Sequence, residues 1–118
     1  MSLKVGIVSA MQREVGPMLK HWQEGLLEYD GRKYTVWRTV GAVYIESGIG
    51  HGPAIFATRA LVGNQRPDIL VSAGFAGALT RLLTVGESIA PGTVIDASTG
   101  KRFNLHSGTG VLVSASVI

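Results

Sequence analysis

The segment 68–79, with the sequence DILVSAGFAGAL, constrains the fold more than any other part of the chain. It begins with a short apolar run, Ile69 to Val71, which follows Pro67 and Asp68. Continuous apolar runs of this length are typical of a parallel strand that is covered on both faces. The segment therefore predicts a buried strand in an α/β sheet.

Small residues follow this strand and predict a loop with an almost bare backbone. Such a loop lets a ligand approach N–H groups at the carboxyl end of the strand, where open α/β sheets bind their ligands. The alternative is a tight turn in which glycine supplies a positive φ angle. The small residues are Ala73, Gly74, Ala76, Gly77 and Ala78.

The amino-terminal part of the chain predicts a strand over 3–9 and then a helix. Ser9 and Gln12 have the spacing of a capping box, so a helix should begin there. Pro17 requires this helix to kink or restart. Glu14 would then lie near the helix amino terminus, where a carboxylate usually serves only to offset the helix dipole. The apolar face of this helix would hold Met11, Val15, Met18 or Leu19, and Trp22.

The next segments predict a hairpin, a strand and a second helix. The hairpin covers 26–40, with Asp30 and Gly31 as its two-residue turn, and the strand covers 42–46. Alternating glycines in the loop 47–53 could hold a phosphate, although their spacing is not that of the dinucleotide fingerprint. His51 in this loop could act as an acid or base, but a loop histidine with no evident partner is more often solvated. The second helix should begin at Pro53 and end at Gly63-Asn64.

The last third predicts a strand over 93–97, a polar loop over 98–110 and a buried strand over 111–118. With 118 residues the chain is one domain at most. It lacks cysteine, which excludes disulfides and thiolate metal sites, and no signal peptide or membrane-spanning run is evident. A net charge of +3 is spread along the chain and argues against nucleic acid as a partner. We expect a cytoplasmic chain with no metal and no cofactor.

The chain contains four motifs in a characteristic order and spacing: KVGIVSAMQREV at 4–15, SGIG at 47–50, the segment 67–79 and LTVGE at 83–87. Together they resemble the amino-terminal half of methylthioadenosine/S-adenosylhomocysteine nucleosidases. These enzymes belong to the wider superfamily of purine nucleoside and uridine phosphorylases. The resemblance covers residues 4–97 well and 111–118 loosely.

The resemblance implies a three-layer αβα fold with a mixed sheet and cleavage of the N-glycosidic bond of a purine nucleoside. Glu14 matches the glutamate that orients the attacking water in the nucleosidases. Ile49 and Gly50 match the loop that lines the sugar, and the loop beside the ribose and base matches Phe75, Ala76 and Gly77. The family also implies a small-molecule nucleoside as partner and a homodimer or larger ring; the high hydrophobic content, 46%, fits a covered surface.

The chain departs from the family pattern at two matched positions. Phosphorylases of the family carry an arginine for phosphate where this chain has Ser72, which favours hydrolysis over phosphorolysis. Many relatives have a small hydroxyl residue at Phe75, so a hydrogen bond to the sugar or nucleophile is lost and the pocket is altered.

The family's segment for the ribose hydroxyls and its base-protonating aspartate have no counterpart among the 118 residues. Asp96 lacks the family context for that acid role. We therefore expect residues 1–118 to form a single, partial domain, apparently truncated, whose active site is that of an incomplete half-enzyme. The alternatives are a nucleoside phosphorylase, a non-catalytic fragment that binds a nucleoside or forms oligomers, and an unrelated Rossmann-like binding module.

Overall fold

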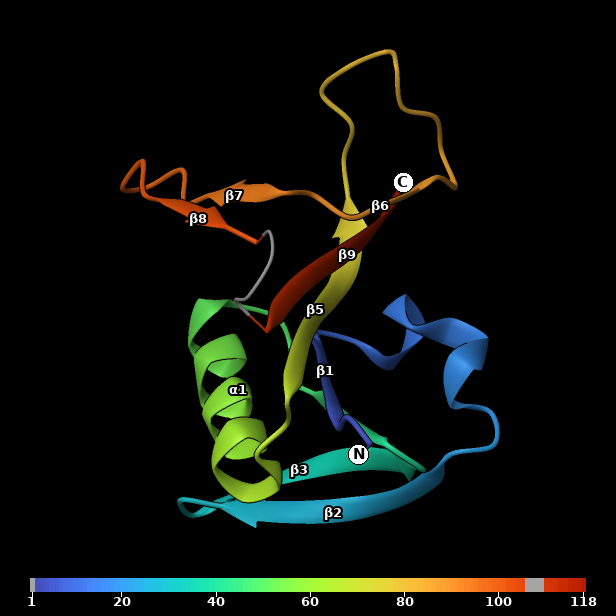
Figure 1. The fold of residues 1–118 in the computed structure, drawn as a ribbon, viewed down its shortest axis with the longest axis vertical. Coiled ribbons are helices and arrows are strands. Elements are labelled where there is room, and N and C mark those ends of the chain that lie inside the picture. The colour runs from blue at the N-terminus through green and yellow to red at the C-terminus, as the bar shows by residue number, and fades with distance from the viewer. Residues whose placement is uncertain (1, 106–109) are drawn as a thin grey trace.

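A seven-stranded mixed sheet forms the centre of the computed structural model, which describes residues 2–105 and 110–118 (Figure 1). The strand order is β2-β3-β4-β1-β5-β9-β6. The four central strands, from β4 to β9, run parallel, and the outer pairs are antiparallel. The strands are β1 Val5–Ser9, β2 Gln23–Tyr29, β3 Arg32–Thr39, β4 Ala42–Glu46, β5 Ile69–Ala76, β6 Ser88–Ile89 and β9 Val111–Val117.

Each face of the sheet is covered by a different helical layer, which confirms the predicted three-layer α/β fold. Helix α1, His51–Gln65, packs on one face, where Ala57, Ala60 and Leu61 meet Val8 and Ile45. Two 3-10 helices, η1 Gln12–Glu14 and η2 Gly16–Leu19, lie on the other side of β1 (Figure 1). The second core holds Ile7, Leu19, Trp37 and Tyr44, with Val15 and Trp22 packed against it.

The predicted helix after β1 is wrong in type but right in its apolar face. Gly16 has a φ of 53°, a left-handed conformation that interrupts an α-helix, and Pro17 cannot donate to its hydrogen-bond ladder. The segment therefore forms two short 3-10 turns. Val15, Leu19 and Trp22 nevertheless pack against the sheet as expected, whereas Met18 is 41% exposed.

The hairpin of β2 and β3 is confirmed. Asp30 and Gly31 have φ angles of 51° and 74°, the positive pair that a two-residue hairpin turn requires. The pairing runs from Gln23 opposite Arg38 to Tyr29 opposite Arg32.

Helix α1 begins earlier and ends later than predicted. It begins at His51, two residues before Pro53, and runs through Gly63 and Asn64 to Gln65. Gly63 does not end the helix: a Cβ atom there would lie 2.5 Å from the Tyr29 hydroxyl oxygen, so glycine permits the close approach of β2. Arg66, with a φ of 48°, ends the helix in its place.

Strand β5 is longer than the apolar run predicts. It continues through Gly74 to Ala76 because β9 pairs with it along its length, from Leu70 opposite Val111 to Ala76 opposite Val117. The predicted glycine loop therefore begins only at Gly77. Strand β9 is only half-buried, with Leu112 48% exposed, so the expectation of a buried strand there is wrong.

The predicted polar loop over 98–110 contains a strand. Strand β7, Thr93–Ile95, pairs with β8, Arg102–Asn104, in a separate two-stranded ladder that projects from the main sheet (Figure 1). Residues 106–109 of that loop lie outside the described residues. Along 2–105 and 110–118, no helix combines the length and the apolar character needed to cross a membrane.

Candidate active site

A cavity of about 210 Å³ lies at the carboxyl ends of β1 and β4, beside the middle of β5. The chain leaves β1 toward the 3-10 layer and leaves the adjacent β4 toward α1, on the opposite face. Connections that diverge from neighbouring parallel strands open a crevice, which is the usual ligand site of α/β sheets. The lining residues are Val8, Ser9, Ala10, Glu14, Ser47, Gly48, Gly50, Ala54, Ser72 and Ala73.

Glu14 joins two elements that are far apart in the sequence. Its Oε1 accepts a hydrogen bond of 2.9 Å from the Met11 N–H, and its Oε2 accepts one of 3.1 Å from the Phe75 N–H in β5. Two backbone donors fix the orientation of a carboxylate and stabilise its charge. The carboxylate is half-buried beside the cavity, with lone pairs left to bind a further group.

Gly74 allows the carboxylate to lie against β5. A Cβ atom at this position would be 2.9 Å from Glu14 Oε2, closer than side chains come in proteins. Its φ angle is not positive, so the glycine serves close approach and not turn formation. This is the physical reason for a glycine inside a paired strand.

The glycine loop after β4 forms the opposite wall of the cavity. Its backbone continues the β1–β4 pairing: the Ser47 N–H donates to the Ser9 carbonyl at 2.9 Å, and the Gly48 N–H donates to the Ala10 carbonyl at 3.0 Å. Gly50 has a φ of 118° and precedes the first residue of α1. The loop is thus held to β1, and glycines keep side chains out of the cavity.

The other residues that were expected at the site do not line this cavity. The side chain of Ile49 is 75% exposed and does not line the cavity. Phe75 contributes its N–H group to Glu14, while its side chain is 39% exposed. Ala76 ends β5 and Gly77 follows it, and neither lines the cavity. His51 is exposed at the start of α1 and also lies outside the lining.

Sequence reasoning missed two polar residues, Ser9 and Tyr44, beneath Glu14. The Ser9 Oγ donates to the Met11 carbonyl at 2.9 Å and lies 2.5 Å from the Tyr44 hydroxyl. Burial raises the pKa of Tyr44 from 10.0 to about 12. A tyrosine within the apolar strand 42–46 was the available signal, because a buried tyrosine hydroxyl needs a partner.

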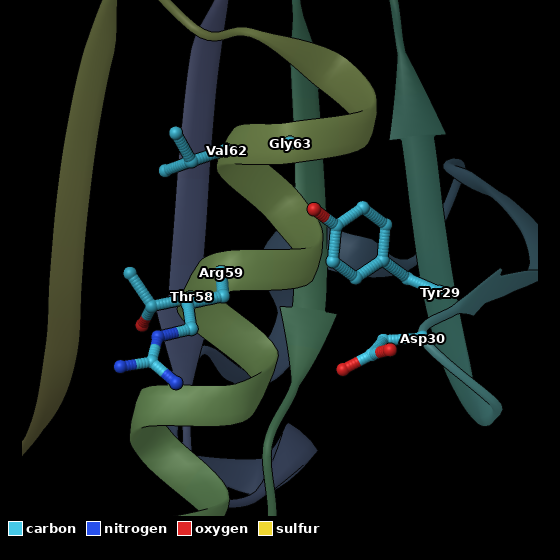
Figure 2. Close-up of a pocket in the computed structure, with 6 residues that line it drawn as sticks. All are labelled: Tyr29, Asp30, Thr58, Arg59, Val62 and Gly63. Atoms are coloured by element: carbon cyan, nitrogen blue, oxygen red, sulfur yellow. The ribbon is translucent and has the colours of Figure 1, made fainter.

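A larger hollow, of about 710 Å³, lies away from this edge of the sheet, between α1 and the β2–β3 turn. Figure 2 shows Tyr29, at the end of β2, and Asp30, in the turn, beside α1. It is an open surface depression without the convergent strand ends of the Glu14 cavity. We therefore place the candidate site at Glu14 and not at this larger hollow.

The chain matches the family model described as the phosphorylase superfamily over residues 4–114. It is 33% identical over 92 residues to a 5'-methylthioadenosine/S-adenosylhomocysteine nucleosidase of Listeria welshimeri, which covers 74% of this chain and 39% of that protein. The corresponding nucleosidase of Staphylococcus aureus is 36% identical over 87 residues, with 70% of this chain and 38% of that protein covered. The chain thus spans about two fifths of the length of these relatives.

The fold is similar to that of a solved nucleosidase. The structure of the 5'-methylthioadenosine/S-adenosylhomocysteine nucleosidase of Colwellia psychrerythraea, in complex with adenine, superposes with a TM-score of 0.73 at 22% identity. The superposition covers 99% of this chain and 61% of the Colwellia chain. The similarity shows that the two chains share a fold, and the family match over 4–114 shows that this chain belongs to the phosphorylase superfamily.

Proposed function

We propose that the chain provides the water-activating side of a purine nucleosidase site. The substrate would be a nucleoside of the methylthioadenosine or S-adenosylhomocysteine kind, the substrates named for its relatives. The observation that carries this proposal is the Glu14 carboxylate, held by the N–H groups of Met11 and Phe75 at the edge of the cavity.

In the proposed reaction, Glu14 accepts a hydrogen bond from a water molecule and orients it toward the anomeric carbon. As the bond to the base breaks, positive charge develops on the sugar ring, and the nearby carboxylate stabilises it. Glu14 takes up a proton as the water adds. The backbone of Gly48 and Gly50 lets the sugar approach closely; we propose Ile49 beside its substituent, and the segment of Phe75, Ala76 and Gly77 beside the ribose and base.

The charge of the cavity favours water over phosphate as the nucleophile. Its lining residues among those described include one carboxylate, Glu14, and no lysine or arginine. Ser72, at the position where phosphorylases of the family carry arginine, lines the cavity without a charge. A phosphate dianion beside Glu14 would be repelled with no cation to offset it.

The test is chromatography of free base after incubation with methylthioadenosine, S-adenosylhomocysteine, inosine and uridine, with and without phosphate. If the chain cleaves these nucleosides, we expect adenine from the first two substrates at a rate that phosphate does not change. Glu14→Gln should lower this rate about 10²- to 10⁴-fold. The matched control is Glu28→Gln, which removes an exposed carboxylate from β2. Phosphate-dependent release, or full activity in Glu14→Gln, would contradict the proposal.

A second candidate is a chain that binds a nucleoside without cleaving it. It is favoured by the absence of a second titratable side chain among the described residues that line the cavity, because the departing base needs an acid. Calorimetric titration with adenine and methylthioadenosine distinguishes the two: binding without release of base supports this candidate, and release excludes it.

We also propose that two copies associate through α1. Two large apolar residues on the outer side of this helix, Phe56 and Val62, are 37% and 45% exposed. Exposed apolar side chains that lie on one helix can mark a contact with a second copy. Light scattering of the purified chain tests this; a dimer is expected, and Val62→Glu should shift it toward monomer.

A further inference from the structure

Ser9 and Tyr44 form a polar pair inside the second core. Ser9 is 3% exposed, Tyr44 is fully buried, and their hydroxyl oxygens are 2.5 Å apart. The Tyr44 ring lies against Trp37, with ring centroids 5.3 Å apart, and belongs to the cluster of Ile7 and Leu19. Packing thus leaves the Tyr44 hydroxyl little freedom to move away from Ser9.

The direction of the hydrogen bonds follows from the number of protons. The Met11 carbonyl can only accept, so Ser9 donates its single hydroxyl proton to that carbonyl. Tyr44 must therefore donate to Ser9. Burial raises the pKa of Tyr44 to about 12, which keeps this proton in place throughout the neutral pH range.

The chain of bonds ends at the carboxylate of the candidate site. The Met11 residue whose carbonyl accepts from Ser9 also donates its N–H to Glu14 Oε1 at 2.9 Å. The Glu14 N–H returns a bond of 3.0 Å to the same Met11 carbonyl. We infer that Tyr44 and Ser9 are positioning residues that hold the Met11–Glu14 turn, and with it the Glu14 carboxylate, in the orientation needed to activate water.

This inference deepens the proposed function and rests on it for its meaning, since positioning matters only where Glu14 acts. Without the Tyr44 donor, the Ser9 hydroxyl can rotate toward the cavity that it lines. The Met11 carbonyl would then lose the hydrogen bond that it accepts from the Ser9 hydroxyl, and the Met11–Glu14 turn would open more often. The effect should be local, because the strand pairing of β1 with β4 and β5 does not depend on this hydroxyl.

The test is amide hydrogen exchange, followed by NMR, on the full chain. Tyr44→Phe removes only the hydroxyl, and we expect exchange at Met11 and Phe75 to become about tenfold faster, the equivalent of one lost hydrogen bond. Ser9→Ala should have the same effect. The double variant should add nothing to either single change, because both act through one chain of bonds.

The matched control is Tyr34→Phe, which removes a tyrosine hydroxyl from neighbouring β3 on the other face of the sheet. It should leave exchange at Met11 and Phe75 unchanged. A general loss of stability would instead accelerate exchange in the β2–β3 hairpin as well, and that pattern overturns the inference. Unchanged exchange at both amides in Tyr44→Phe also overturns it.

The assay of base release provides an independent test of the positioning role of Tyr44. If the chain releases adenine, Tyr44→Phe should lower kcat about tenfold and leave KM within about twofold, because the nucleophile and not the substrate is misplaced. A rise in KM alone would contradict the inference. If the wild-type chain releases no base while exchange responds as expected, the proposed function fails and the positioning of Glu14 stands.

Discussion

Residues 5–76 and residues 77–105 are held in place by different kinds of interaction. In the first region, side chains pack on both faces of the sheet, and all but one of the buried apolar residues among those described belong to it. In the second, no apolar residue is fully buried, and Leu79, Leu82 and Val85 have exposed fractions of 103%, 88% and 80%. All the residues that line the candidate site belong to the first region.

Backbone hydrogen bonds and turns organise the second region. The Gly86 N–H donates to the Val117 carbonyl at 2.9 Å, and the Val117 N–H donates to the Glu87 carbonyl at 2.8 Å. The β7–β8 ladder is closed by a turn at Asp96 and by a bond of 2.7 Å from the Leu105 N–H to the Gly92 carbonyl. Burial of side chains therefore determines the conformation of residues 5–76, whereas backbone hydrogen bonds and turns determine that of residues 77–105.

The largest expected contrast is between two leucine truncations. Leu61→Ala should destabilise the chain by about 2–5 kcal/mol, because Leu61 is fully buried between α1 and the sheet and its loss leaves a cavity. Leu82→Ala should change stability by less than about 0.5 kcal/mol. Urea unfolding followed by circular dichroism measures both. A comparable loss in Leu82→Ala would show that the second region is packed against something.

Titration of Tyr44 should couple pH to the stability of the packed region. Its folded pKa is raised to about 12, above the 10.0 of the exposed group, chiefly by burial, with further increases from Glu46 and Glu14. The folded state thus holds its proton more tightly, so the stabilisation is complete below pH 10 and is lost as pH rises toward 12. The full loss is on the order of 3 kcal/mol.

Urea midpoints at several pH values between 9 and 12 measure this loss. Tyr44→Phe should show a smaller fall over the same interval, because it lacks the hydroxyl that loses its proton. Equal falls in the two proteins would mean that Tyr44 is not buried in its neutral form.

The pattern of apolar residues predicted the packed region, residues 5–76, well because apolar residues occur in the sequence where side chains become buried. The runs predicted as strands at 3–9, 42–46 and 69–71 each contain or begin a central strand, although β1 starts only at Val5, and Asp30-Gly31 forms the hairpin turn. The errors fall where a neighbour overrides the local signal. Pairing with β9 extended β5 past Gly74, and the close approach of Tyr29 placed Gly63 inside a helix.

The candidate site could be predicted only in part. Glu14 and Gly50 were identified by motif, and the structure places both at one cavity. The role of the Phe75 N–H could not be predicted from the sequence, because its partner Glu14 is 61 positions away in the chain. The Ser9–Tyr44 bond joins residues 35 positions apart, a distance that no local pattern specifies.

Gly63→Ala tests whether the close approach of Tyr29 requires a glycine inside α1. Alanine is the better helix former by about 1 kcal/mol, so a surface position would be stabilised. Here the new methyl group would meet the Tyr29 hydroxyl, and we expect a net loss of about 1–2 kcal/mol in urea unfolding. Tyr29→Ala combined with Gly63→Ala should recover part of that loss. Gly77→Ala, with no atom within 4 Å of its Cβ position, is the control in the second region.

The smallest effect is expected from Asp96 in the projecting hairpin. Its carboxylate accepts bonds of 2.7 and 2.9 Å from the Ser98 hydroxyl and N–H, which lower the pKa of Asp96 below its usual value. The turn is therefore stabilised above pH 3.8 and loses this support as pH falls through the lowered pKa. Asp96→Ala should shift the Ser98 amide resonance and leave the urea midpoint unchanged, because the group is exposed and β7–β8 is a ladder separate from the main sheet. A shifted midpoint would show that the hairpin and the packed region unfold as one unit, and the contrast between the two regions would then be one of exposure alone.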